Sequence, residues 1–183
     1  AEPDLYRTYP KGSGMTSADL LLDGFDRIQM LVHDVVDGLT ADDLTVRLDD
    51  RANTIGWLVW HLTRVQDDHI AGVSGDEQVW TAKGWHDRFG LPFRPGSIGY
   101  GHTSAEVAAV RVDPPALLTE YYDAVHEQTV RFVRDLRDDD LARVVDEAWD
   151  PPVTLGVRLV SVLSDDLQHA GQAAFIRGEL ARR

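Results

Sequence analysis

Cysteine is absent from the 183-residue sequence. This absence excludes a disulfide framework, a thiolate metal site and a cysteine nucleophile. Any thiol chemistry that the protein performs must therefore use a thiol from outside the chain.

Positive charge is scarce, since Lys11 and Lys83 are the two lysines of the sequence. Lysine and arginine together number 18 against 31 acidic residues, which leaves a net charge of −13. A surface of this kind repels phosphate backbones and anionic lipid headgroups, both of which favour Lys and Arg. We therefore expect neither a nucleic-acid partner nor a membrane partner.

Long apolar runs are missing as well. No stretch approaches the ~20 residues of a membrane span, and the first residues lack the basic-then-apolar pattern of a signal peptide. The expectation is a cytoplasmic protein. Residues 1–14 contain Pro3, Pro10, Gly12 and Gly14 without apolar periodicity, which is typical of a tail or a cloning remnant. Residues 15–183, in a chain that is 43% apolar, suffice for one domain with a substantial core.

Apolar residues recur at helical spacing in four segments. The predicted helices cover residues 17–38, 54–72, 114–137 and 155–178, with Asn53 or Thr54 as the cap of the second and Pro114-Pro115 at the start of the third. A short turn capped by Thr40 is expected between the first two helices. No alternating strand pattern or internal repeat stands out, so the predicted fold is an all-α four-helix bundle.

The segment of residues 75–105 is rich in Gly, Pro and aromatic residues. It is too long for a plain connection between the second and third long helices, and it is better interpreted as an ordered functional loop. We expect it to contain short helices or turns and to cover a pocket.

One group of residues could bind a metal ion. Asp165 and His169 are four apart on the last helix, which places both side chains on one face, and His61 lies in an otherwise apolar stretch of the second helix. Two nitrogens and a carboxylate oxygen suit Zn²⁺ or another first-row divalent ion, with a coordination position left open. The alternative interpretation is a core His61 bonded to a backbone carbonyl and an ordinary surface pair of Asp165 and His169. Spacing alone favours that alternative.

Two longer motifs contain these residues. They are Asn53-Thr54-Ile55-Gly56-Trp57-Leu58-Val59-Trp60-His61-Leu62 and Asp165-Asp166-Leu167-Gln168-His169-Ala170-Gly171-Gln172. Over residues 17–178 the chain resembles the DinB-like superfamily of four-helix bundles. The resemblance implies a metal held by His61, Asp165 and His169, although Asp165 stands where the commoner family pattern has histidine. The segments Gly84-Trp85, Gly99-Tyr100-Gly101-His102 and Val153 to Val160 resemble an actinobacterial branch whose members are often called mycothiol transferases.

Four further residues are candidates for a substrate or thiol pocket. Trp60 adjoins His61, Arg64 could pair with a substrate carboxylate or with Asp68 one turn later, and Gln172 shares a helix side with His169. Asp68 could orient a ligand or bind substrate. Each also has a structural interpretation, as core filling, a surface ion pair, a solvated carboxylate or a capping group.

The first functional hypothesis is a metal-dependent S-transferase or isomerase that uses a low-molecular-weight thiol, with mycothiol expected from the resemblance, on a small electrophile. Coordination to a divalent cation deprotonates a thiol and so supplies a nucleophile without any cysteine in the chain. Zinc is the first choice of metal, with Ni, Mn or Fe as alternatives. The second hypothesis is a non-catalytic module that binds a metal or small ligand in a stress response, and the third is a metal-dependent hydrolase. No catalytic acid or base is identified, and a homodimer is left open.

Overall fold

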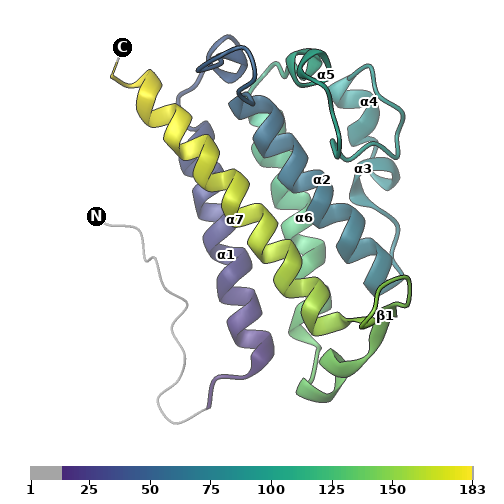
Figure 1. Cartoon of the computed structure of the whole chain (residues 1–183). Helices are drawn as coiled ribbons and strands as arrows, with labels where there is room; N and C mark the ends of the chain where they lie inside the picture. Colours follow the sequence, from purple (N-terminus) through teal and green to yellow (C-terminus); the bar gives the residue numbers. More distant parts are fainter. Residues whose placement is uncertain (1–13, 183) are drawn as a thin grey trace.

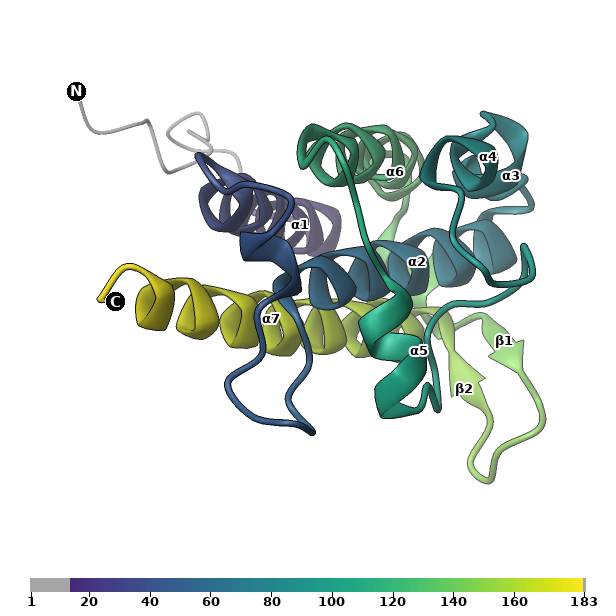
Figure 2. The ribbon, with the colours of Figure 1, turned by 90° about the horizontal axis from the view of Figure 1, so that it is seen from above.

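The computed structural model describes residues 14–182, and most of this part of the chain is helical. The four long helices are α1 (Ser17–Val36), α2 (Ile55–Ser74), α6 (Ala116–Arg134) and α7 (Leu155–Leu180). Helix α1 packs against α6 and α7, and α2 packs against the same two helices, so the four form a bundle (Figures 1 and 2). The predicted all-α four-helix bundle is confirmed. The predicted tail lies outside the described residues except for Gly14 and is not described.

Threonine side chains begin three of the four long helices. Thr16, Thr54 and Thr154 accept hydrogen bonds from backbone N–H groups three residues later, which satisfies donors that have no partner inside the helix. Of the two caps proposed for the second helix, the structure uses Thr54. Gly75 ends this helix with φ of 84°, a conformation that glycine adopts without steric cost.

Helix α2 is the most deeply buried helix around the site. Apolar residues of α6 and α7 cover it on the bundle side, and the segment of residues 75–105 covers it on another (Figure 2). Its buried positions therefore include polar side chains as well as apolar ones, among them His61, Arg64, Gln66 and Asp67. A buried polar group needs a partner, so α2 concentrates the residues whose contacts decide the site.

The segment between α2 and α6 is ordered and contains the short helices α3 (Val79–Ala82), α4 (Trp85–Phe89) and α5 (Ser104–Ala109). Trp80, Trp85 and Phe89 from this segment pack against Tyr121 of α6, with ring centroids 5.1, 5.5 and 5.8 Å away. The expected short helices are present. The aromatic composition of the segment reflects packing on α2 and α6.

Two short strands are the main departure from the predicted elements. Strands β1 (Val144–Asp146) and β2 (Val153–Thr154) pair antiparallel ahead of α7. Strands of this length are too short for an alternating pattern, which is why the sequence did not reveal them. Two 3-10 helices complete the described part of the fold, Asp43–Thr45 beside Thr40 as expected and Asp138–Ala142 after α6. In the part of the chain that the structure describes, no helix combines the length and apolarity needed to cross a membrane.

Candidate metal centre

His61 lies in the middle of α2 and is 5% exposed. Its Nδ1 donates a hydrogen bond to the backbone carbonyl of Ile98, which leaves Nε2 as the nitrogen available to a ligand. Trp57, one turn earlier, stacks on the imidazole with ring centroids 4.5 Å apart. The ring of His61 is therefore fixed from two sides.

Gly99 makes this close approach to His61 possible. A Cβ atom at position 99 would lie 2.7 Å from His61 Nδ1 and 3.1 Å from Trp60 Cζ3, and the φ of Gly99 is +93°. Both the space and the backbone conformation therefore require glycine at this position. The loop that contains Ile98 and Gly99 acts as a support for the imidazole.

Asp165 and His169 lie one turn apart on α7. His169 Nε2 is 3.6 Å from Asp165 Oδ1, and His169 Nδ1 donates to Gln172 Oε1 at 3.2 Å. The second carboxylate oxygen, Asp165 Oδ2, is buried and has no hydrogen-bond partner among residues 14–182. An unpaired buried carboxylate oxygen is costly unless something binds it.

The packing of α2 on α7 brings the three residues together. One ligand atom from each of His61, Asp165 and His169 lies within 4.8 Å of the others, and the two imidazole centroids are 4.9 Å apart. The alternative interpretation of the sequence was a core His61 bonded to a backbone carbonyl, with an ordinary surface pair of Asp165 and His169. It accounts for the Ile98 contact and for that pair. It does not account for the convergence of all three groups or for the unpaired oxygen of Asp165. The donor set therefore fits a divalent metal ion.

The local charges favour an ionised carboxylate at the centre of the group. The hydrogen bond that His169 donates to Asp165, opposed by burial, raises the pKa of His169. Burial raises the pKa of Asp165, but His169, with smaller contributions from His61 and His69, outweighs it and leaves that pKa lowered. Burial lowers the pKa of His61. A neutral His61 beside an ionised Asp165 presents two groups in the protonation state that a metal requires.

Asp166, the next residue along α7, has different surroundings from Asp165. It is turned about 100° around the helix from Asp165 and is fully buried. Burial, and then the neighbouring charge of Asp165, raise its pKa well above the ordinary range. Asp166 is thereby favoured in its neutral form.

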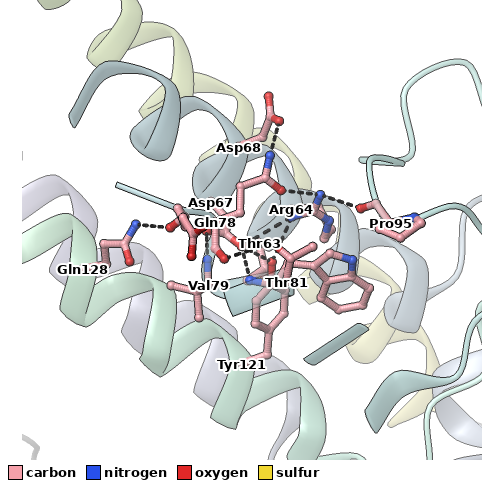
Figure 3. A network of polar contacts seen from close by, with 12 residues as sticks. Thr63, Arg64, Asp67, Asp68, Gln78, Val79, Thr81, Pro95, Tyr121 and Gln128 are labelled. Atoms are coloured by element: carbon pink, nitrogen blue, oxygen red, sulfur yellow. Dashed lines mark hydrogen bonds and ion pairs between the residues drawn. The ribbon is translucent and has the colours of Figure 1, made fainter. Parts of the chain in front are cut away.

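The partners of Arg64 differ from those expected from the sequence, which were a substrate carboxylate or Asp68. Arg64 is 0% exposed and cannot meet a substrate carboxylate from a solvent-filled pocket. Its ion pair is with Asp67, at 3.4 Å, and not with Asp68. It also donates to Gln78 Oε1 and the Pro95 carbonyl (Figure 3). Arg64 therefore connects α2 to the segment of residues 75–105, which we call the aromatic segment.

The other three pocket candidates have different surroundings. Trp60 is 1% exposed and packs against Trp80, Phe93 and His102, so it fills the core beneath the aromatic segment. Asp68 accepts a hydrogen bond from Gln78 at 2.7 Å and borders a small polar cavity with His69 and Arg158. Of the four candidates, Gln172 directly contacts one of the three grouped residues.

Sequence reasoning missed the supports of the site. The carbonyl of Ile98 is a backbone group, so the residue type gives no sign of its role. Gly99 was noted only as part of the segment Gly99-Tyr100-Gly101-His102. A further contact is the hydrogen bond from Trp57 Nε1 to His102 Nδ1 at 3.2 Å, which joins the ring stacked on His61 to the loop. In the sequence, the one sign of a tight turn there was the pair of glycines that flank Tyr100. Both adopt positive φ in the structure.

Comparisons with known proteins agree with this architecture. A solved structure from Enterococcus faecalis, described as the conserved protein of locus, is similar with a TM-score of 0.84 and 28% identity, over 90% of this chain and 96% of that chain. No curated protein matches the sequence. The model of the DinB superfamily matches residues 24–173. With a match over most of its length and the same arrangement of helices, the chain belongs to the DinB superfamily.

Proposed function

We propose that His61, Asp165 and His169 bind one divalent metal ion, with zinc as the first choice, and that a small thiol occupies its open coordination position. The proposed activity is that of an S-transferase or isomerase acting on a small electrophile. Mycothiol is the first thiol to test. The arrangement of the two imidazoles carries the proposal, because each Nδ1 is bonded to an oxygen acceptor and His169 Nε2 faces Asp165 Oδ1 at 3.6 Å.

The acceptors behind the histidines support this proposal. A metal-binding histidine usually donates its other N–H to a carbonyl or similar acceptor, which fixes the tautomer and the ring orientation. The carbonyl of Ile98 and the side chain of Gln172 serve this purpose here. An ordinary core histidine would need one such acceptor, but would not need its second nitrogen to face a carboxylate.

The chain itself supplies a rigid setting around His61. Trp57 covers His61, and the two ring systems are inclined by only 19°. A bound divalent ion would lower the pKa of a coordinated thiol so that a thiolate forms at neutral pH. In the transfer, a bond forms between sulfur and the electrophilic carbon while the bond from that carbon to the leaving group breaks. The leaving group departs with the bonding electron pair, and the thiol proton passes to solvent.

Metal content and thiol coordination test the two parts separately. The purified protein should retain close to one equivalent of zinc after dialysis, and His169→Ala should retain none, while His33→Ala on the exposed surface of α1 behaves as the wild type. In cobalt-substituted protein, mycothiol, bacillithiol or glutathione should produce a thiolate-to-cobalt charge-transfer band. Undiminished zinc in His169→Ala would show that the site is misplaced.

Turnover separates an enzyme from a binding module. Conjugation of the coordinated thiol to a panel of alkyl and aryl halides and epoxides should be faster with the wild type than with His169→Ala. Thiol coordination without turnover of any panel member would favour the non-catalytic module. A zinc-loaded protein that gives no thiol band but hydrolyses esters or amides would favour the hydrolase.

A further inference from the structure

A cavity of about 410 Å³ lies beside the candidate metal centre, between α7 and the segment that precedes α2. This volume is within the range of small-molecule sites, which measure ~300–1,000 Å³. Its walls are formed by Leu48, Ala52, Asn53, Leu58, Gly171, Gln172, Phe175 and Ile176. We name it the α7 cavity.

Gln172 links the α7 cavity to the grouped ligands. Gln172 borders the cavity and accepts the hydrogen bond from His169 Nδ1 at 3.2 Å. On the other helix, Leu58 borders the cavity and directly follows Trp57, which stacks on His61. A molecule in the cavity would therefore lie next to Gln172, which orients His169, and next to the residue that follows Trp57 on α2.

The lining of the α7 cavity is mainly apolar. Phe175 is 60% exposed and Leu48 is 37% exposed, so two large apolar side chains at its mouth remain in contact with water. Asn53 and Gln172 contribute the polar side chains. Apolar walls with a few polar groups near a reactive centre are typical of a pocket for the hydrocarbon part of a ligand.

A second cavity next to the same two helices has the opposite chemistry. It measures about 160 Å³ and is bordered by Asp68, His69 and Arg158 among others. Arg158 is already bonded to Asp146 at 2.8 Å and donates to His69 Nδ1 at 3.3 Å. A hydrocarbon group would leave these polar groups without water, so the α7 cavity is the better site for it.

From these observations we infer that the α7 cavity binds the apolar body, an alkyl chain or an aromatic ring, of the small substrate. The reactive polar end of that substrate then faces His61, Asp165 and His169. This second statement rests on the proposed function, whereas the binding of the apolar body does not. The cavity thus sets the substrate class as small amphipathic molecules with a hydrocarbon part.

Binding of straight-chain alcohols to the full chain tests this inference. Calorimetry with 1-butanol, 1-hexanol and 1-octanol should show an affinity that rises by up to roughly fourfold for each added methylene until the cavity is filled. The measurement is made on zinc-loaded protein and on protein treated with a chelator. Both forms should bind the alcohols, because the metal does not line the cavity.

Two variants remove the cavity without touching the grouped ligands. A Cβ at Gly171 has no neighbour within 4 Å, so Gly171→Leu can fill the cavity from its wall. Phe175→Asp places a charge at the exposed mouth. We expect each to weaken 1-octanol binding at least tenfold. The matched controls are Gly178→Leu on the same helix and Leu167→Asp, an exposed leucine of α7 outside the cavity.

The outcomes separate this inference from the proposed function. Wild-type affinity for 1-octanol in both cavity variants, or no binding of any alcohol by the wild type, overturns the inference. A dimer that dissociates in Phe175→Asp, with no alcohol binding by the wild type, assigns the cavity to a second copy and also overturns it. Zinc content is measured on the same samples. Loss of the proposed metal site would leave the alcohol result unchanged.

Discussion

The two histidines of the candidate centre are oriented by different kinds of acceptor. His61 uses a backbone carbonyl in a loop that has no room for a side chain at position 99, whereas His169 uses Gln172 three residues later on the same helix. The first support depends on the docking of the aromatic segment. The second is local to α7 and can be changed without disturbing the rest of the fold.

Gln172→Leu tests the local support. Without the amide oxygen, His169 loses the group that fixes its tautomer and orientation, so the dissociation constant for zinc should rise by about 10- to 100-fold. Competition with a chromophoric chelator measures the constant. Gln168→Leu is the control, because Gln168 bonds to Ser164 and not to His169. Equal zinc affinity in Gln172→Leu and wild type would contradict the assigned role.

His102 should make the loop sensitive to acid. Its Nδ1 accepts from Trp57 Nε1, and its Nε2 donates to Ser97 Oγ at 3.1 Å. Protonation would turn Nδ1 into a donor facing another donor. Burial lowers the pKa of His102, with a smaller opposing effect of the Glu106 charge. Its contribution to stability is therefore complete above the unfolded-state pKa of about 6.5 and is lost as pH falls toward the folded-state pKa.

Urea unfolding between pH 7.5 and 5 measures this effect. The wild type should lose more stability on acidification than His102→Gln, whose amide does not titrate. Because the two proteins differ at position 102 alone, the difference between the two curves isolates that residue. Parallel curves would show that His102 does not sense pH in this range.

At the scale of elements, α2 joins the site to the aromatic segment through a buried polar network. The carboxylate of Asp67 accepts from the backbone N–H groups of Val79 and Trp80, both at 2.8 Å, and from Tyr121 at 2.7 Å. Arg64 lies against this carboxylate, with its guanidinium 5.0 Å from the centroid of Trp80 (Figure 3). The network positions α3 and the segment that follows it, which includes Ile98.

Arg64→Met should reveal how much this network contributes. Removing one partner of a buried ion pair leaves the other charge unpaired and costs about 3–5 kcal/mol of unfolding free energy. Arg131→Met is the control, because its pair with Glu127 is exposed and should contribute less than about 1 kcal/mol. Chemical denaturation measures both. A loss in Arg64→Met no larger than in the control would show that water or neighbouring groups compensate the buried Asp67.

At the scale of the whole molecule, the bundle does not depend on the metal for its core. Phe25, Ile28, Leu58, Tyr121 and Leu159 are among the fully buried residues that connect all four long helices. The metal would therefore act as a ligand of a protein that is already folded. Its effect on stability follows from binding to the native state alone.

Zinc should raise the unfolding free energy in proportion to the logarithm of its free concentration. At a free concentration 100-fold above the dissociation constant the gain is about 2.7 kcal/mol. Thermal unfolding with buffered zinc measures it, and chelator treatment should reverse it while the far-ultraviolet circular dichroism stays helical. His169→Ala should show the same helical spectrum without the gain. An equal zinc-dependent shift in this variant would place the stabilising site elsewhere.

The sequence by itself determined the four long helices, because helical apolar periodicity is a local signal. It also determined that Asp165 and His169 share one face of the last helix, since a spacing of four residues suffices for that. His61 stood out as a histidine within an apolar stretch. These local patterns made the three residues candidates, and the resemblance to the DinB-like superfamily grouped them. Neither identified the contacts around them.

Only the tertiary structure decided which partners these residues have. Arg64 could reach Asp67 or Asp68 along the helix, and burial under the aromatic segment selected Asp67. The carbonyl of Ile98 reached His61 across 37 positions of the chain, through a turn that Gly99 permits. Backbone groups look alike at every position of a sequence, so such contacts exist as specific interactions only after the helices and loops have packed.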